Sequence, residues 1–329
     1  MENVKNQRTI EKAQQQTGLI DVHHHILPPD YTSALANIGI RNAGGATFPN
    51  WSVQKALNFM DQKGIATAIT SISSPGVYFG DNDFSITLAK RCNEFSANLI
   101  SDNPNRFGGF AVLPLPNVDA ALKELEYAID NLQLDGVVLL TNIDGHYLGA
   151  PIFDEVFAEL NRREAIVFIH PTTPAYGELS QLKMPAHLLE FVFDTTRAIS
   201  NLILNNTFER FPNIRFIVSH AGGTAPYLAA RITALDFGFR EEYKIDTTGH
   251  LKNLYYDTAL SAAPSTLRAL QELVDPSHIL FGSDYPFVPT PVISKFISLL
   301  EEYDGFDEKS LKAIGRESAL KLFPRFSTE

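Results

Sequence analysis

The run Leu19-Ile20-Asp21-Val22-His23-His24-His25 is largely apolar and ends in three consecutive histidines. Its branched apolar residues favour a short, buried strand. Alternate side chains of a strand point to the same side, so His23 and His25 face one point while His24 faces the opposite way. Two imidazoles that converge at the end of a strand form half of a metal site. This stretch therefore predicts a strand that delivers metal ligands at its C-terminal end.

Seven further apolar, β-branched runs follow. Helical patterns near 52–63, 83–102, 118–132, 151–163, 187–210, 224–237 and 263–273 alternate with the eight runs, and two more, 291–304 and 308–322, follow the last run. Continuous apolar strands are covered on both faces, and eight strands each followed by a helix are typical of a (β/α)8 barrel, the α/β fold called the TIM barrel. The alternative is an open doubly wound sheet, which usually has a glycine-rich phosphate turn where this chain has histidines. The expected strands are Leu19–His25, Ala66–Ser73, Phe107–Leu115, Gly136–Leu140, Ala165–His170, Ile214–His220, Leu254–Leu260 and Ile279–Asp284.

Composition limits the classes of protein that this chain can be. The 329 residues are 44% hydrophobic, enough for a large core, so we expect one barrel domain over 18–329, with a lid loop at about 26–51 and a flexible N-terminal extension over 1–17. A net charge of −11 argues against nucleic acid and anionic membranes as partners. The only cysteine is Cys92, which excludes an intramolecular disulfide and predicts a cytoplasmic protein.

Polar residues end four of the predicted strands, and the C-terminal ends of barrel strands are where the chemistry of this fold takes place. The first strand ends in His23 and His25, the fifth in His170, the sixth in His220 and the eighth in Asp284. A single histidine at a strand end is usually structural. Five such residues at one mouth predict a catalytic site instead.

Five motifs resemble a known family. They are Asp21–Pro29, Trp51 followed by Met60–Gly64, Phe168–Pro171, Ser219–Gly223 and Gly282–Phe287. Together they resemble the amidohydrolase superfamily and, within it, the aminocarboxymuconate-semialdehyde decarboxylase branch. The resemblance covers nearly all of residues 18–322. Within the branch, the chain looks most similar to the 6-methylsalicylate decarboxylases, which are salicylate-type enzymes.

The resemblance implies a site with one divalent metal ion. Relatives with two metals bridge them with a lysine after the fourth strand, where this chain has Thr141 and Asn142. Mixed imidazole and carboxylate ligation suits Zn²⁺, with Mn²⁺ as the alternative. The ligands implied by the family are His23, His25, His170 and Asp284.

The resemblance also implies a carbon–carbon lyase that removes CO2 without oxidation from a salicylate-like or related unsaturated carboxylic acid. In this interpretation His220 stands beside the metal as a base or proton carrier, and Asp284, alone or with His220, donates the proton. The alternative is a metal-dependent hydrolase of the same fold, such as a lactonase. The family also implies a homodimer, and it implies a small carboxylic acid as the substrate.

Four residues are expected to contact the substrate, and three of them have a structural alternative. Trp51 and Phe287 would flank an aromatic ring, although Trp51 could equally pack in the core. The backbone N–H of Gly222 would bind an anion, or form a simple tight turn. Arg197 would hold a carboxylate or phenolate, or pair with Asp194 or Glu190.

One departure from the aminocarboxymuconate enzymes bears on the substrate. Those enzymes carry an arginine a few residues before the matching tryptophan, for a second carboxylate, where this chain has Gly44 and Gly45. The departure favours a monocarboxylate.

Overall fold

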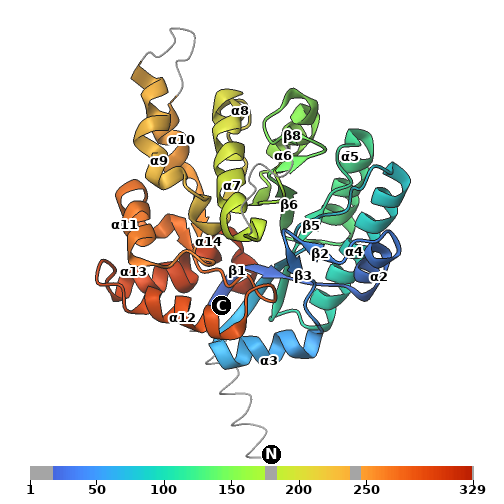
Figure 1. Ribbon diagram of the computed structural model, residues 1–329, viewed down its shortest axis with the longest axis horizontal. Helices are drawn as coiled ribbons and strands as arrows, with labels where there is room; N and C mark the ends of the chain where they lie inside the picture. The colour runs from blue at the N-terminus through green and yellow to red at the C-terminus, as the bar shows by residue number, and fades with distance from the viewer. Residues whose placement is uncertain (1–17, 175–183, 238–245, 328–329) are drawn as a thin grey trace, which may run out of the picture.

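The computed structural model describes residues 18–174, 184–237 and 246–327. Its central feature is an eight-stranded parallel sheet whose strands follow one another in chain order, and Figure 1 shows the helices arranged around these strands. The strands are β1 (Leu19–His25), β4 (Ile65–Ser71), β5 (Phe107–Val112), β6 (Gly136–Leu140), β9 (Ile166–His170), β10 (Arg215–Val218), β11 (Tyr255–Asp257) and β12 (Ile279–Leu280).

The first and last strands meet and close the sheet into a barrel. Val22 N donates to Phe281 O at 3.0 Å, and Asp284 N donates to His23 O at 2.8 Å. The carboxylate of Asp21, which is fully buried, reinforces the closure by accepting hydrogen bonds from the backbone N–H of His23 and of Ser283. The predicted TIM barrel is therefore confirmed.

Helices cover the outside of the barrel at the predicted places. The helices that follow the strands are α3 (Val53–Lys63), α4 (Asn82–Asp102), α5 (Val118–Glu126), α6 (Asp154–Arg162), α7 (Ala186–Leu204), α8 (Thr207–Arg210), α9 (Ala225–Ile232), α11 (Pro264–Leu273), α12 (Thr290–Glu301), α13 (Glu308–Lys312) and α14 (Ser318–Leu322). Ser52 and Asn117 cap α3 and α5, because their side chains accept from backbone N–H groups three residues later.

Five of the predicted strands end early, and in the seventh and eighth the backbone leaves the extended region. The seventh and eighth stop at Asp257 and Leu280, short of the predicted Leu260 and Asp284. Leu260 and Asp284 have φ angles of 50° and 58°, which belong to the left-handed region and cannot continue a strand. The turn out of the strand is what aims the Asp284 side chain.

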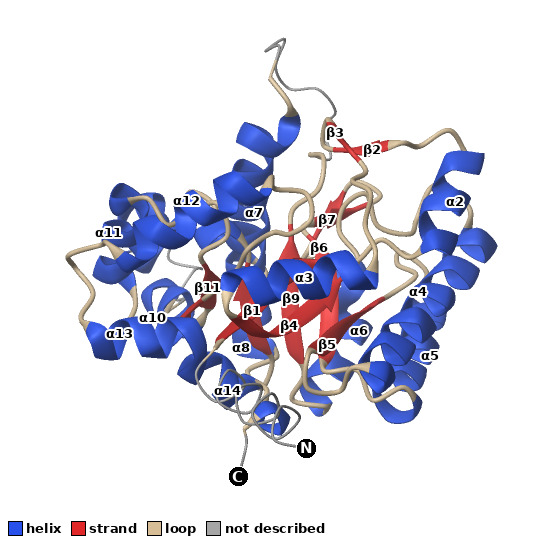
Figure 2. Ribbon diagram, turned by 90° about the horizontal axis from the view of Figure 1, so that it is seen from below, coloured by secondary structure: helices blue, strands red, loops and turns tan. Residues whose placement is uncertain are grey.

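The segment 26–51, which we expected to be an irregular loop, holds regular structure. Helix α2 (Pro29–Asn37) follows β1, and β2 (Asn42–Ala43) pairs with β3 (Ala46–Thr47) in a short antiparallel hairpin. Figure 2 shows this hairpin at the top of the view, above the barrel strands. A further helix absent from the predicted set is α10 (Thr247–Asn253). Within the described residues, no helix is both long and apolar enough to cross a membrane.

Candidate metal centre

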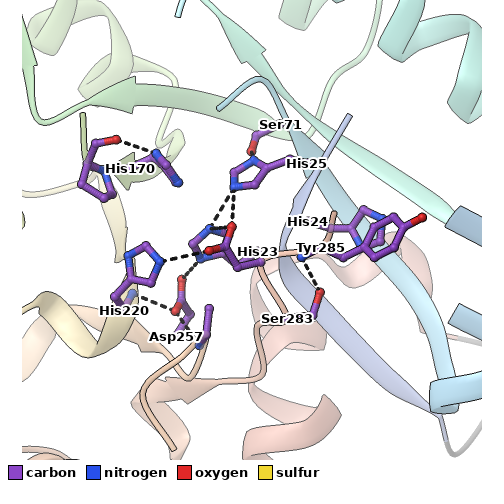
Figure 3. A network of polar contacts seen from close by, with 12 residues as sticks. His23, His24, His25, Ser71, His170, His220, Asp257, Ser283 and Tyr285 are labelled. Atoms are coloured by element: carbon purple, nitrogen blue, oxygen red, sulfur yellow. Dashed lines mark hydrogen bonds and ion pairs between the residues drawn. The ribbon is translucent and has the colours of Figure 1, made fainter. Parts of the chain in front are cut away.

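Four buried side chains meet at the C-terminal mouth of the barrel. His23 and His25 come from the end of β1, His170 ends β9, and Asp284 lies in the turn after β12. One ligand atom from each of the four lies within 4.8 Å of the others. Figure 3 shows the rings of His23, His25, His170 and His220 directed toward one another, while His24 points away. The strand-end residues that the sequence singled out are thus brought together.

In each of the three histidine ligands, the ring nitrogen that faces away from the cluster lies within hydrogen-bond distance of a polar group. His23 Nδ1 lies 2.7 Å from Asp257 Oδ2, and His170 Nδ1 lies 2.7 Å from the carbonyl oxygen of Pro171. A carboxylate and a carbonyl can only accept, so in the neutral ring both Nδ1 atoms carry the proton and both Nε2 atoms present a lone pair. His25 Nδ1 lies 2.9 Å from the hydroxyl of Ser71, which can donate or accept.

The centre of the cluster fits a divalent cation. His23 Nε2 and His25 Nε2 face each other at 3.0 Å, and Asp284 Oδ1 lies 3.4 Å and 3.1 Å from them. Lone pairs and a carboxylate oxygen at these distances repel unless positive charge lies between them. Three imidazoles and one carboxylate suit Zn²⁺ and other divalent transition metals.

The electrostatics of the cluster agree with this interpretation. Burial lowers the pKa of His23, but the carboxylates of Asp257 and Asp284 outweigh it and raise that pKa to about 10. Burial lowers the pKa of His25 to about 4 and that of His170 well below its ordinary value. Two carboxylates thus demand positive charge at this point, and two neighbouring imidazoles are neutral ligands. A divalent cation satisfies both conditions.

His220 stands beside the four candidate ligands. Its Nε2 lies 3.4 Å from Asp284 Oδ2, whereas Asp284 Oδ1 is directed toward His23 and His25. One carboxylate therefore connects the cluster to His220. Both His220 and Asp284 have left-handed backbone, with φ angles of 52° and 58°. Such conformations are uncommon for residues other than glycine and concentrate at functional sites.

A cavity of about 190 Å³ opens onto the cluster. This volume lies below the roughly 300–1,000 Å³ of pockets for drug-sized ligands, so it suits one small molecule. The polar side chains on its wall are Ser73, His170, His187, His220 and Asp284. The rest of the wall is apolar: Ala43, Ala46, Leu188, Phe191, Leu260, Phe287, Val288, Pro289 and Val292.

The hairpin β2–β3 forms part of this wall. Its Ala43 and Ala46 line the cavity, and its turn is fastened to the start of α7. Both the backbone N and the Nδ1 of His187 lie within hydrogen-bond reach of Gly44 O, at 3.1 Å and 3.0 Å. A side chain at Gly44 would collide with the ring of Phe191, 2.4 Å from its Cβ position. The hairpin thus packs tightly over the cavity.

The four expected substrate contacts do not share one location. Phe287 lines the cavity, and its ring lies 5.6 Å from that of His25. Trp51 is absent from the described lining and packs on Phe95 at 6.0 Å, as in the core alternative.

Arg197 is also absent from the described lining of the cavity. Neither pairing proposed for it is present among the described residues, because Asp194 instead accepts hydrogen bonds from Thr141, Asn142 and Tyr147. Arg197 Nη1 is buried and has no hydrogen-bond partner among the described residues.

Gly222 belongs to a tight turn. Its N–H donates to Ser219 O at 3.0 Å, and the next N–H, of Gly223, donates to His220 O. These N–H groups are engaged within the turn. A Cβ at Gly222 would lie 2.7 Å from the ring of Tyr256, so close packing explains the glycine. The contacts favour the tight-turn alternative over anion binding.

Sequence reasoning missed Asp257 and His187. Asp257 holds His23, but it lies inside the predicted strand Leu254–Leu260, and only the residues at strand ends were considered. A lone carboxylate in the apolar seventh strand was the available signal. His187 seemed remote from the strand ends because it starts a helix. The hairpin contact that places it on the cavity joins segments about 140 residues apart, which no local pattern reveals.

Comparison with known proteins agrees with the fold and the cluster. The model of the amidohydrolase family, described as "Amidohydrolase", matches residues 20–325. The chain is 36% identical over 316 residues to a 6-methylsalicylic acid decarboxylase of Penicillium expansum, covering 93% of this chain and 96% of the relative.

Solved structures of similar proteins share this fold. A crystal structure described as amidohydrolase II superposes with a TM-score of 0.89 at 33% identity, over 93% of this chain and 99% of the other. The fold is also similar to 5-carboxyvanillate decarboxylase of Novosphingobium aromaticivorans, solved with manganese and a nitrobenzoic acid, with a TM-score of 0.82 at 21% identity over 94% and 97% of the chains. The family model spans almost the whole barrel and includes every residue of the cluster, so this chain belongs to the amidohydrolase family.

Proposed function

We propose that this chain is a metal-dependent, non-oxidative decarboxylase of a salicylate-type carboxylic acid, a carbon–carbon lyase. The observation that carries the proposal is the buried cluster of three histidines and one aspartate, with His220 beside it, at the floor of a small cavity with apolar walls. The similarity to a 6-methylsalicylic acid decarboxylase over almost the whole chain supports the same reaction.

In this proposal His23, His25, His170 and Asp284 hold one divalent metal ion. Zn²⁺ is the first candidate because three imidazoles and a carboxylate are typical zinc ligands. Mn²⁺ is the alternative, supported by the manganese in the structure of the carboxyvanillate enzyme. The metal would supply charge stabilisation and fix the position of the carboxylate and of an ortho hydroxyl.

The cavity wall favours a monocarboxylate with an apolar substituent. Within the described lining there is no lysine or arginine, so a second carboxylate would lose its hydration without gaining a cationic partner. A methyl group would instead meet apolar neighbours such as Phe191 and Val292. Phe287, at the edge of the cluster, is placed to flank the ring. These features support 6-methylsalicylate as the first substrate to assay.

His220 and Asp284 are placed to handle the proton. His220 Nε2 faces Asp284 Oδ2, so this pair can hold a proton on the cavity side of the cluster. In the proposed step the proton moves to the ring carbon that bears the carboxylate. The bond between that carbon and the carboxylate then breaks, CO2 leaves, and the bonding electrons restore the aromatic ring.

A homodimer and a cytoplasmic location remain predictions. On α7, Leu202 and Ile203 are buried. Leu188, Phe193 and Leu204 on α7 are exposed apolar side chains, and a second copy of the chain could cover them.

The test separates decarboxylation from hydrolysis. The metal-loaded protein is incubated with substituted salicylates and, separately, with lactones, and the release of CO2 and of acid is followed. We expect CO2 from 6-methylsalicylate and no acid from lactones. The variant Asp284→Asn should lose CO2 release. Near-normal turnover by that variant would exclude the proposed role of Asp284, and lactone hydrolysis without CO2 would favour the alternative.

A further inference from the structure

Asp257 contacts two separate parts of the site through one carboxylate. It ends β11 and is fully buried. Its Oδ2 lies 2.7 Å from His23 Nδ1, while its Oδ1 accepts from the backbone N–H of His220 at 2.9 Å and of Ala259 at 3.0 Å. Figure 3 shows Asp257 between His23 and His220. The neighbouring Gly282 leaves room for this approach, since a Cβ there would lie 3.2 Å from Asp257 Cβ.

We propose that Asp257 is a positioning residue that fixes His23 as a metal ligand and His220 beside the metal at the same time. The inference rests on the ligand set proposed above and is independent of the substrate. Because Asp257 only accepts, it keeps the proton of His23 on Nδ1 and leaves the Nε2 lone pair for the metal. By holding the N–H of His220, it also fixes the left-handed turn that carries that ring.

The arrangement requires a carboxylate, and an amide of the same shape cannot replace it. In an Asp257→Asn variant, two backbone N–H donors would hold the single amide oxygen at the Oδ1 position. The amide NH2 would then face His23 Nδ1 and donate to it. His23 would have to carry its proton on Nε2, which points into the cluster, and that nitrogen could no longer bind a metal.

The two variants at position 257 should therefore differ in metal affinity. An alanine at position 257 removes the hydrogen bonds but leaves His23 free to keep its lone pair on Nε2. Asparagine preserves the shape but enforces the wrong tautomer. Metal affinity should therefore fall further in Asp257→Asn than in Asp257→Ala. A merely structural role predicts the opposite order, because asparagine fills the buried space that alanine leaves empty.

The chain provides a matched control in Asp21. This carboxylate is also fully buried and also accepts from backbone N–H groups and from a histidine Nδ1, that of His24 at 3.0 Å. His24, however, points away from the cluster (Figure 3). Asp21→Asn should therefore keep metal affinity close to that of the unmodified chain.

The experiment measures the dissociation constant of Zn²⁺ by competition with a chromophoric chelator, using protein first stripped of metal. We expect Asp257→Asn to bind Zn²⁺ about 10- to 100-fold more weakly than the unmodified chain, and more weakly than Asp257→Ala. Nitrogen-15 NMR of the histidine rings should show His23 protonated on Nε2 in Asp257→Asn. This second readout is independent of the alanine variant, which Asp257→Ser replaces if it does not fold.

Two kinds of result would contradict two different parts of the proposal. Equal or smaller loss of affinity in Asp257→Asn than in Asp257→Ala, or His23 still protonated on Nδ1, would overturn the role of Asp257. A His23→Ala variant that binds Zn²⁺ as tightly as the unmodified chain would overturn the proposed ligand set itself.

Discussion

The closure of the barrel depends on Asp21, and its replacement gives a stability prediction that needs no assay of activity. Asp21 accepts four hydrogen bonds: from the backbone N–H of His23 at 3.1 Å and of Ser283 at 3.0 Å, from the Ser283 hydroxyl at 2.5 Å, and from His24 Nδ1 at 3.0 Å. Asp21→Ala removes all four hydrogen bonds and leaves two buried backbone donors without a partner. Each orphaned donor costs about 1–3 kcal/mol.

We expect Asp21→Ala to lower the free energy of unfolding by about 3–5 kcal/mol, as for other buried groups that lose a charged partner. Asp21→Asn should lose only about 1–2 kcal/mol, because its oxygen still accepts from both backbone donors while the Ser283 hydroxyl and His24 can reverse their roles. Urea denaturation at pH 7 measures both. A loss below about 1 kcal/mol in Asp21→Ala would refute the view that this carboxylate closes the barrel.

Three further predictions test other parts of the molecule. His187→Ala should raise KM several-fold with little change in kcat, because it removes the side-chain contact with Gly44 that holds the hairpin over the cavity; steady-state kinetics with 6-methylsalicylate checks this, and an unchanged KM would contradict it. Hydrogen bonds from neighbouring arginines lower the pKa of Glu159 to about 2, so its stabilisation is complete above its usual pKa of 4.5 and is lost as the pH falls from there toward 2. Glu159→Gln should lower the free energy of unfolding by about 1 kcal/mol at pH 7 and by distinctly less at pH 3. If urea denaturation shows the same difference between variant and unmodified chain at both pH values, the ion pairs are excluded as its cause. Gly223→Ala should lower the free energy of unfolding by at least about 3 kcal/mol, because the new Cβ would lie 2.0 Å from Val192 O. Near-native thermal stability would show that helix α7 can move away from this Cβ.

The barrel and the cluster could be predicted because both depend on local patterns. Each strand is a short apolar run, and polar residues at the end of a run lie at the mouth of the barrel, so His170 could be placed there without knowing its neighbours. His23 and His25 lie on one side because a strand alternates, and His24 was correctly expected to face away. It packs instead against the ring of Tyr285, at 4.9 Å.

The remaining features depend on contacts between distant segments. The role of Asp257 appears only when the closed barrel brings His23 of β1 within 2.7 Å of Asp257 on β11, and the role of His187 only when the hairpin reaches α7. Arg197 and Trp51 lie outside the described lining of the cavity for a related reason. The side chain of a helix or loop residue can face several directions, and tertiary packing decides among them. A residue at the C-terminal end of a barrel strand can face only the mouth of the barrel.

The proposed reaction is tested most directly by running it in D2O with 6-methylsalicylate labelled with carbon-13 in the carboxyl group. The account predicts that the labelled carbon leaves as CO2, and that the product carries one deuterium on the ring carbon that bore the carboxylate. Label retained in the organic product, or deuterium at a different ring position, would contradict decarboxylation by protonation beside His220 and Asp284.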